Sequence, residues 1–161
     1  MESELESEPS YSHTACETIE IFESLPGKAG CSPELLDDIE RHFGGALPPL
    51  YRRLMESDAN RMVSILKLVH PSSLIEQRTD SDRLLADDQD DYTFRLESNH
   101  VVITIGELGM GFNYFEANGD DSTPVFYFDT EDDSKDVRPR IESRTFADYI
   151  ASRIRERLQL P

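Results

Sequence analysis

The sequence predicts an α+β domain in which helices come first, strands follow and one helix closes the chain. Apolar residues recur at helical spacing between residues 32 and 56, β-branched and aromatic residues concentrate between 92 and 129, and a capped amphipathic segment begins at Thr145. Because these patterns are segregated along the chain, an antiparallel sheet is expected rather than alternating βαβ units. A length of 161 residues suits one domain.

The first 31 residues contain few apolar residues at helical or strand spacing. They contain seven acidic residues and one lysine, interleaved with Ser, Pro and Gly. Such a segment buries too little apolar surface to offset the entropy of ordering. We therefore expect a disordered acidic tail over residues 1–31 and a folded domain over residues 32–161. Residues 18–22 alternate briefly, which is compatible with a short strand or with a helix induced by a partner.

Two helices are predicted at the start of the domain. Ser32 provides an N-cap hydroxyl, Pro33 suits the first helical position, and Gly44-Gly45 ends the run. Pro48-Pro49 begins the second helix. The apolar faces consist of Leu35, Leu36, Ile39 and Phe43 in the first helix and Leu50, Tyr51, Leu54 and Met55 in the second.

The middle of the chain predicts one strand and one loop. Residues 62–69 are mostly β-branched or aliphatic, which favours a strand, and residues 74–75 suit a short helical turn. Residues 79–91 contain six aspartates in thirteen residues, so we expect a solvated, self-repelling loop there.

The second half predicts an antiparallel meander. Strands are expected at 92–96, 101–105 and 112–116, and the last of these pairs with 125–129 across a turn at 118–121. An acidic loop spans 130–139. Thr145 then caps the closing helix, with Asp148 three residues on as in a capping box. The buried face of that helix is predicted to contain Phe146, Tyr149, Ile150, Ile154 and Leu158.

The formal charge of −17 opposes polyanionic partners, because phosphates are repelled by acidic side chains. Nucleic acid and membrane surfaces are therefore not expected partners, whereas a basic protein is complementary; solubility alone also accounts for such acidity. The charge is uneven: residues 80–136 carry a net −13 and residues 137–161 a net +3.

No leader pattern or apolar run of about 18 residues occurs, so a cytoplasmic protein with free thiols at Cys16 and Cys31 is expected.

Motifs for catalysis or metal binding are not found. The sequence has no His-Glu-x-x-His, Cys-x-x-Cys, Gly-x-Ser-x-Gly or phosphate-loop pattern, and its four histidines are remote from one another. Residues 129–140 begin like a calcium loop, but Ser134 stands where glycine is required and Arg140 where a bidentate glutamate belongs. We therefore expect no enzyme activity, no cofactor and no metal site.

The order of several short motifs resembles the SUKH superfamily. Gly44-Gly45 precedes LPPLYRRL at residues 47–54, in which Pro49 and Leu50 replace the acidic pair that members often have. The resemblance continues with VVITIG at 101–106, GMGFNYF at 109–115, PVFYFD at 124–129 and SRTFADYI at 143–150. It covers residues 33–158 and implies a non-catalytic α+β domain that binds proteins. The aspartate-rich segment 79–91 and the acidic tail have no counterpart in this pattern.

The resemblance implies an immunity protein that binds and neutralises a polymorphic toxin, and the acidity predicts a basic toxin such as a nuclease. The predicted binding residues come from the two acidic loops: Asp87, Asp88, Asp90, Asp91, Glu131, Asp132, Asp133 and Asp136. A regulatory or scaffold module is the alternative, as in fungal cell-wall regulators of the same superfamily. A small enzyme is a weaker one.

Overall fold

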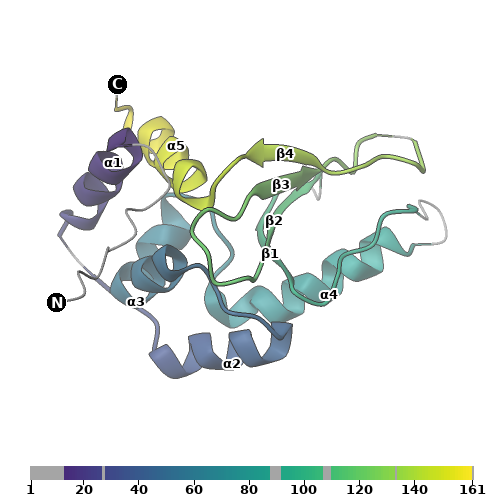
Figure 1. Cartoon of the computed structure of the whole chain (residues 1–161), viewed down its shortest axis with the longest axis horizontal. Helices are drawn as coiled ribbons and strands as arrows, with labels where there is room; N and C mark the ends of the chain where they lie inside the picture. Colours follow the sequence, from purple (N-terminus) through teal and green to yellow (C-terminus); the bar gives the residue numbers. More distant parts are fainter. Residues whose placement is uncertain (1–12, 27, 88–91, 107–109, 133, 161) are drawn as a thin grey trace, which may run out of the picture.

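The computed structural model (Figure 1) describes residues 13–26, 28–87, 92–106, 110–132 and 134–160. Within these residues the chain forms five α-helices and a four-stranded antiparallel sheet of order β1-β2-β3-β4, which confirms the predicted α+β class. The elements are α1 (His13–Glu23), α2 (Pro33–Phe43), α3 (Pro49–Ser64), the short 3-10 helix η1 (Pro71–Ser73), α4 (Leu74–Leu85), β1 (His100–Ile105), β2 (Phe112–Glu116), β3 (Val125–Phe128), β4 (Arg140–Ser143) and α5 (Phe146–Leu158).

Helix α1 corrects the expected tail over residues 1–31. Residues 13–23 are helical, and Ala15, Ile19 and Phe22 are buried, the last two in the main core. These three side chains fall at positions i, i+4 and i+7, which places them on one face of the helix. Figure 1 shows α1 lying beside α5, and the two helices are in contact. Residues 1–12 lie outside the described residues, so the tail prediction stays untested there.

Helix α2 forms as the sequence predicts. The Ser32 hydroxyl accepts a hydrogen bond from the Leu35 amide at 3.3 Å, and Gly44 adopts a left-handed conformation with φ 68° at the C-cap. A side chain at Gly44 would strain this turn, which explains why the chain has glycine there.

Helix α3 runs further than predicted and replaces the expected strand at 62–69. It continues to Ser64 across a kink at Asp58 (φ −159°, ψ 74°). The Asp58 carboxylate accepts a hydrogen bond from the Arg61 amide (3.1 Å), just after the kink, and one from the Ala29 amide (3.3 Å), which joins the segment before α2 to α3. Residues 65–70 form no strand, although Leu66 and Leu68 are buried. Their aliphatic character serves the core rather than a sheet.

Helix α4 corrects the predicted loop at 79–91, because residues 74–85 form one helix. Its buried face contains Arg78 and Ser81 between Leu74 and Leu85, so the apolar period is interrupted. The Arg78 guanidinium donates to the carbonyl oxygens of Leu96 (3.2 Å), Glu97 (2.7 Å) and His100 (2.8 Å). It thereby fixes the segment before β1. The predicted strand at 92–96 is wrong, since these residues form no ladder.

The sheet confirms the predicted β2–β3 hairpin, and β4 is an additional strand that the sequence analysis assigned to no element. The register between β1 and β2 slips between Val102 and Thr104, so that Thr104 lies opposite Asn113. Asp121, in the turn of the hairpin, accepts a hydrogen bond from the Leu50 amide at 2.8 Å and so caps the start of α3. Thr145 caps α5 as predicted, accepting from the Asp148 amide at 3.0 Å.

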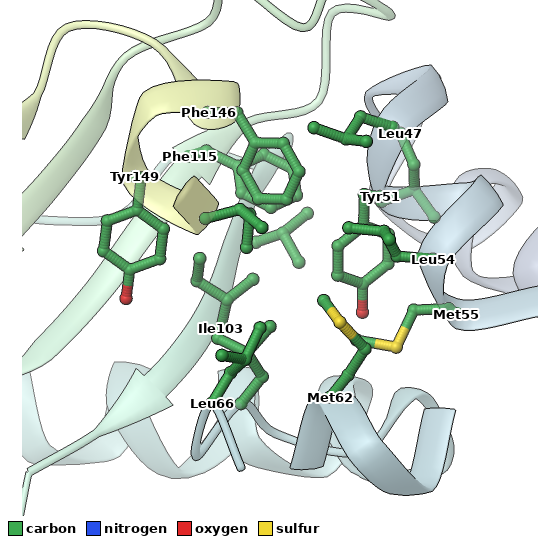
Figure 2. Close-up of a cluster of buried hydrophobic side chains, with 14 of the residues drawn as sticks. Leu47, Tyr51, Leu54, Met55, Met62, Leu66, Ile103, Phe115, Phe146 and Tyr149 are labelled. Atoms are coloured by element: carbon green, nitrogen blue, oxygen red, sulfur yellow. The ribbon is translucent and has the colours of Figure 1, made fainter. Parts of the chain in front are cut away.

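The two faces of the sheet bury separate apolar clusters. The larger cluster joins Val101, Ile103, Phe115 and Val125 of the sheet to helices α1, α2, α3 and α5. Figure 2 shows its centre, where Tyr51 of α3 lies near Phe115 of β2 and Phe146 of α5. The smaller cluster covers the other face with Leu85, Tyr92, Leu96, Val102, Phe112, Tyr114 and Phe128.

Candidate functional site

The two acidic segments predicted to bind a partner are tied together at one end of the molecule. Figure 1 shows the end of α4 and the connection from β3 to β4 at this end. The Tyr92 amide donates to Leu85 O at 3.1 Å, and its hydroxyl donates to Thr130 O at 2.9 Å. The Thr93 amide donates to Lys135 O at 3.0 Å. These bonds fasten the residues after α4 to the acidic connection.

We call the described acidic residues of these segments the acidic end; they are Asp87, Asp129, Glu131, Asp132 and Asp136. Asp87, Glu131, Asp132 and Asp136 are exposed. The other predicted binding residues, Asp88, Asp90, Asp91 and Asp133, lie outside the described residues.

Two carboxylates of the acidic end shape their own loop. Asp129 accepts a hydrogen bond from the Glu131 amide at 2.9 Å, and Asp132 accepts one from the Ser134 amide at 2.8 Å. Aspartate commonly stabilises turns in this way. Glu131 and Asp136 are also exposed, and the turn hydrogen bonds described here are accepted by Asp129 and Asp132, so Glu131 and Asp136 are the better candidates for contacting a partner.

A second feature is a cavity of about 510 Å³ on the face of the sheet that α5 covers. Its basic lining residues come from three separate parts of the chain: Lys67 after α3, Arg140 at the start of β4, and Arg153 and Arg157 on α5. We call this cavity the cationic groove. Thr104, Asn113, Tyr127 and Glu142 also line it, and an adjoining hollow of about 260 Å³ adds Glu156.

Buried polar side chains form the floor of the cationic groove. Thr104 donates its hydroxyl to Asn113 Oδ1 at 2.6 Å, and Asn113 Nδ2 donates to Phe126 O at 3.3 Å. Tyr149 Oη lies 3.3 Å from the same Asn113 oxygen. Burial raises the pKa of Tyr149, so its hydroxyl keeps its proton and can donate to Asn113.

Arg153 is held rigidly above this floor. Its Nε donates to Tyr149 Oη at 2.7 Å and its Nη1 donates to Leu66 O at 3.1 Å. The guanidinium also lies 5.1 Å from the centroid of the Tyr149 ring. Lys67 follows Leu66 in a left-handed conformation, with φ 58°, which is uncommon for a residue other than glycine.

Arg140 is oriented by an aromatic ring on the opposite side. Its guanidinium lies 4.6 Å from the centroid of Tyr127, and the Tyr127 hydroxyl donates to Met110 O at 3.2 Å. The backbone at Gly111 approaches this ring so closely that a Cβ there would lie 2.4 Å from Tyr127 Oη. Because glycine has no side chain, the Tyr127 ring can occupy this position, where it makes the cation–π contact with Arg140.

The cationic groove is not apparent from the sequence. The excess of arginine over residues 137–161 was visible, but it did not show which arginines converge. Lys67 lies in the predicted strand 62–69, which does not form, and the pattern around Thr104, Asn113 and Tyr127 indicates only strand positions. Their meeting depends on the sheet register and on how α5 packs.

No group of three or more metal-binding side chains is found among the described residues, and no helix in this part of the chain could cross a membrane. Comparison of the chain with protein-family models gives no match, and comparisons with curated proteins and with solved structures give no significant match.

Proposed function

We propose that this chain is a non-catalytic, SUKH-type protein-binding domain that acts in the cytoplasm as an immunity protein. Its partner is a basic toxin domain, which it neutralises by covering a cationic surface with the acidic end. The observation that carries the proposal is the convergence of two acidic segments, far apart in sequence, through the hydrogen bonds of Tyr92 and Thr93. Asp129 and Asp132 stabilise their own turn, but the exposed like charges of the acidic end also repel one another, and a cationic partner would compensate them.

The motif order in the sequence and the α+β fold support the choice of a protein partner. An acidic surface of this kind steers a basic protein into contact and raises the association rate at low salt. A nuclease toxin is a suitable partner because it must hold phosphates with basic residues.

Affinity capture from the native cell, followed by mass spectrometry, identifies the partner. We expect a basic toxin domain. Recovery of a signalling or cell-wall complex instead would favour the regulatory alternative and contradict the immunity proposal.

Association rates with the captured partner then test the acidic end. The variant D87N/E131Q/D132N/D136N should associate several-fold more slowly than the wild type at low salt, and the difference should shrink at physiological salt, where the Debye length is about 8 Å. Asparagine at position 132 can still accept the turn hydrogen bond. The control E20Q/E34Q/D38N/E76Q removes the same charge from exposed positions on α1, α2 and α4. An equal slowing in both variants would remove the acidic end from the interface.

A further inference from the structure

The geometry points to the cationic groove as a binding site for a small molecule that carries linked phosphates, of the pyrophosphate or nucleoside diphosphate class. This site lies on the α5 side of the sheet and is lined by none of the residues of the acidic end. The inference is therefore independent of the proposed function.

The charge of the lining is the first reason. The whole chain has about two acidic residues for each basic one, yet the groove has four basic side chains and one carboxylate, Glu142. Among the described residues, no carboxylate forms an ion pair with Lys67, Arg140, Arg153 or Arg157. Four cations around one cavity repel one another, and a bound anion would relieve that repulsion.

The fixed orientation of two arginines is the second reason. Arg153 is held by Tyr149 and by Leu66 O through Nε and Nη1, which leaves Nη2 without a hydrogen-bond partner among the described residues. Arg140 is held by the ring of Tyr127. A guanidinium fixed before binding loses little entropy on binding, and its fork matches two oxygens of a phosphate.

The size and shape of the groove select the class of ligand. About 510 Å³ lies within the usual range for small-molecule sites. A diphosphate near pH 7.5 carries about three negative charges, which balances four bases and one acid. Ile105, at the edge of the cavity, is exposed and offers apolar surface to an organic group.

Isothermal titration calorimetry of the full chain with ADP, pyrophosphate, citrate and adenosine tests this site. ADP and pyrophosphate should bind, and adenosine should not, because it has no charge. Citrate carries a similar charge on carboxylates and should bind at least tenfold more weakly than pyrophosphate. Equal binding of citrate would overturn the phosphate class, and failure of both phosphates to bind at millimolar concentration would overturn the site. Pyrophosphate that binds more tightly than ADP would show that the groove takes the free anion rather than the nucleotide.

Matched pairs of arginines separate the groove from the general charge of the protein. R140Q/R157Q removes two groove cations at exposed positions and should weaken pyrophosphate binding at least tenfold. R138Q/R144Q removes two exposed arginines that do not line the groove and should change binding by less than twofold. An equal loss in both variants contradicts a specific site. Circular dichroism melts of both variants establish that they remain folded.

Discussion

Tyr51 has a buried hydroxyl at the centre of the main core, with no hydrogen-bond partner among the described residues. In Figure 2 this hydroxyl points toward the side chains of Met55 and Met62, and thioether sulfur is only a weak acceptor. Burial raises the pKa of Tyr51, so the group stays neutral. The ring stabilises the fold through its contacts with Phe115 and Phe146. The hydroxyl lowers the stability, because it is buried without a hydrogen bond to the described residues.

Replacing Tyr51 with phenylalanine should therefore leave stability unchanged or raise it by about 1 kcal/mol, because the ring contacts remain and an unsatisfied polar atom is removed. Urea unfolding followed by circular dichroism measures the change. A loss of more than about 1 kcal/mol would mean that the hydroxyl has a partner, such as a bound water, that stabilises the fold.

His100 gives a prediction of pH dependence. Burial lowers the pKa of this half-buried imidazole, and the charge of Arg78 acts in the same direction against Glu97 and Glu116. The neutral ring also accepts a hydrogen bond from the Glu97 amide at Nδ1, 3.0 Å away. Below the ordinary histidine pKa of about 6.5, the unfolded chain takes up a proton that the folded chain resists. Stability should thus be complete above that pH and decline as the pH falls.

Unfolding free energies of the wild type and His100→Asn between pH 7.5 and 5.5 test this. Asparagine can still accept from the Glu97 amide but cannot titrate, so the variant should lose less stability on acidification. Parallel curves for the two proteins would exclude His100 as the cause.

At the scale of the elements, α1 shows how much one buried face contributes. Ile19 and Phe22 belong to the main core, and Glu23 forms an ion pair with Arg53 of α3 at 2.7 Å. Part of a segment predicted to be a disordered tail therefore helps to close the core.

Ile19→Ala should cost about 2–5 kcal/mol, the usual range for truncating a buried aliphatic side chain. Glu20→Ala, at the next and exposed position of the same helix, should change stability by less than about 0.5 kcal/mol. Chemical denaturation of both proteins gives the comparison. If the two substitutions cost the same, α1 does not pack on the core.

The elements that the sequence predicted well are those with complete local signals. Helix α2 has Ser32, Pro33 and Gly44 at its ends, and the β2–β3 hairpin has aromatic strands around a clear turn. Helix α4 was missed because Arg78 and Ser81 occupy its buried face, so the helical period of apolar residues is broken. Helix α1 was missed because the acidic composition outweighed three apolar positions.

Of the two candidate sites, the residues of the acidic end could be predicted from the sequence and the cationic groove could not. The acidic residues were identifiable as runs of like charge, although their meeting at one end depends on bonds made by Tyr92 and Thr93. The cationic groove depends on Lys67, Arg140 and Arg153, which are distant in sequence and come together only through the fold. No local pattern contains that information.

At the scale of the whole molecule, the charge of −17 destabilises the compact state through self-repulsion. Raising the NaCl concentration from about 20 to about 300 mM shortens the Debye length from about 20 Å to about 6 Å. The melting temperature of the wild type should therefore rise by several degrees. The control E20Q/E34Q/D38N/E76Q carries four fewer negative charges and should gain less. A melting temperature that falls with salt would mean that attractive ion pairs dominate.

The contact between α1 and α5 joins the first and last described helices, and it has a consequence for biosynthesis. Residues 13–23 leave the ribosome before residues 146–158 are made, and at roughly 5–20 residues per second the interval lasts on the order of ten seconds. During this interval Ile19 and Phe22 lack the helix that covers them, so the nascent chain presents an apolar helix face to chaperones. Folding of the main core is completed only after α5 has been translated.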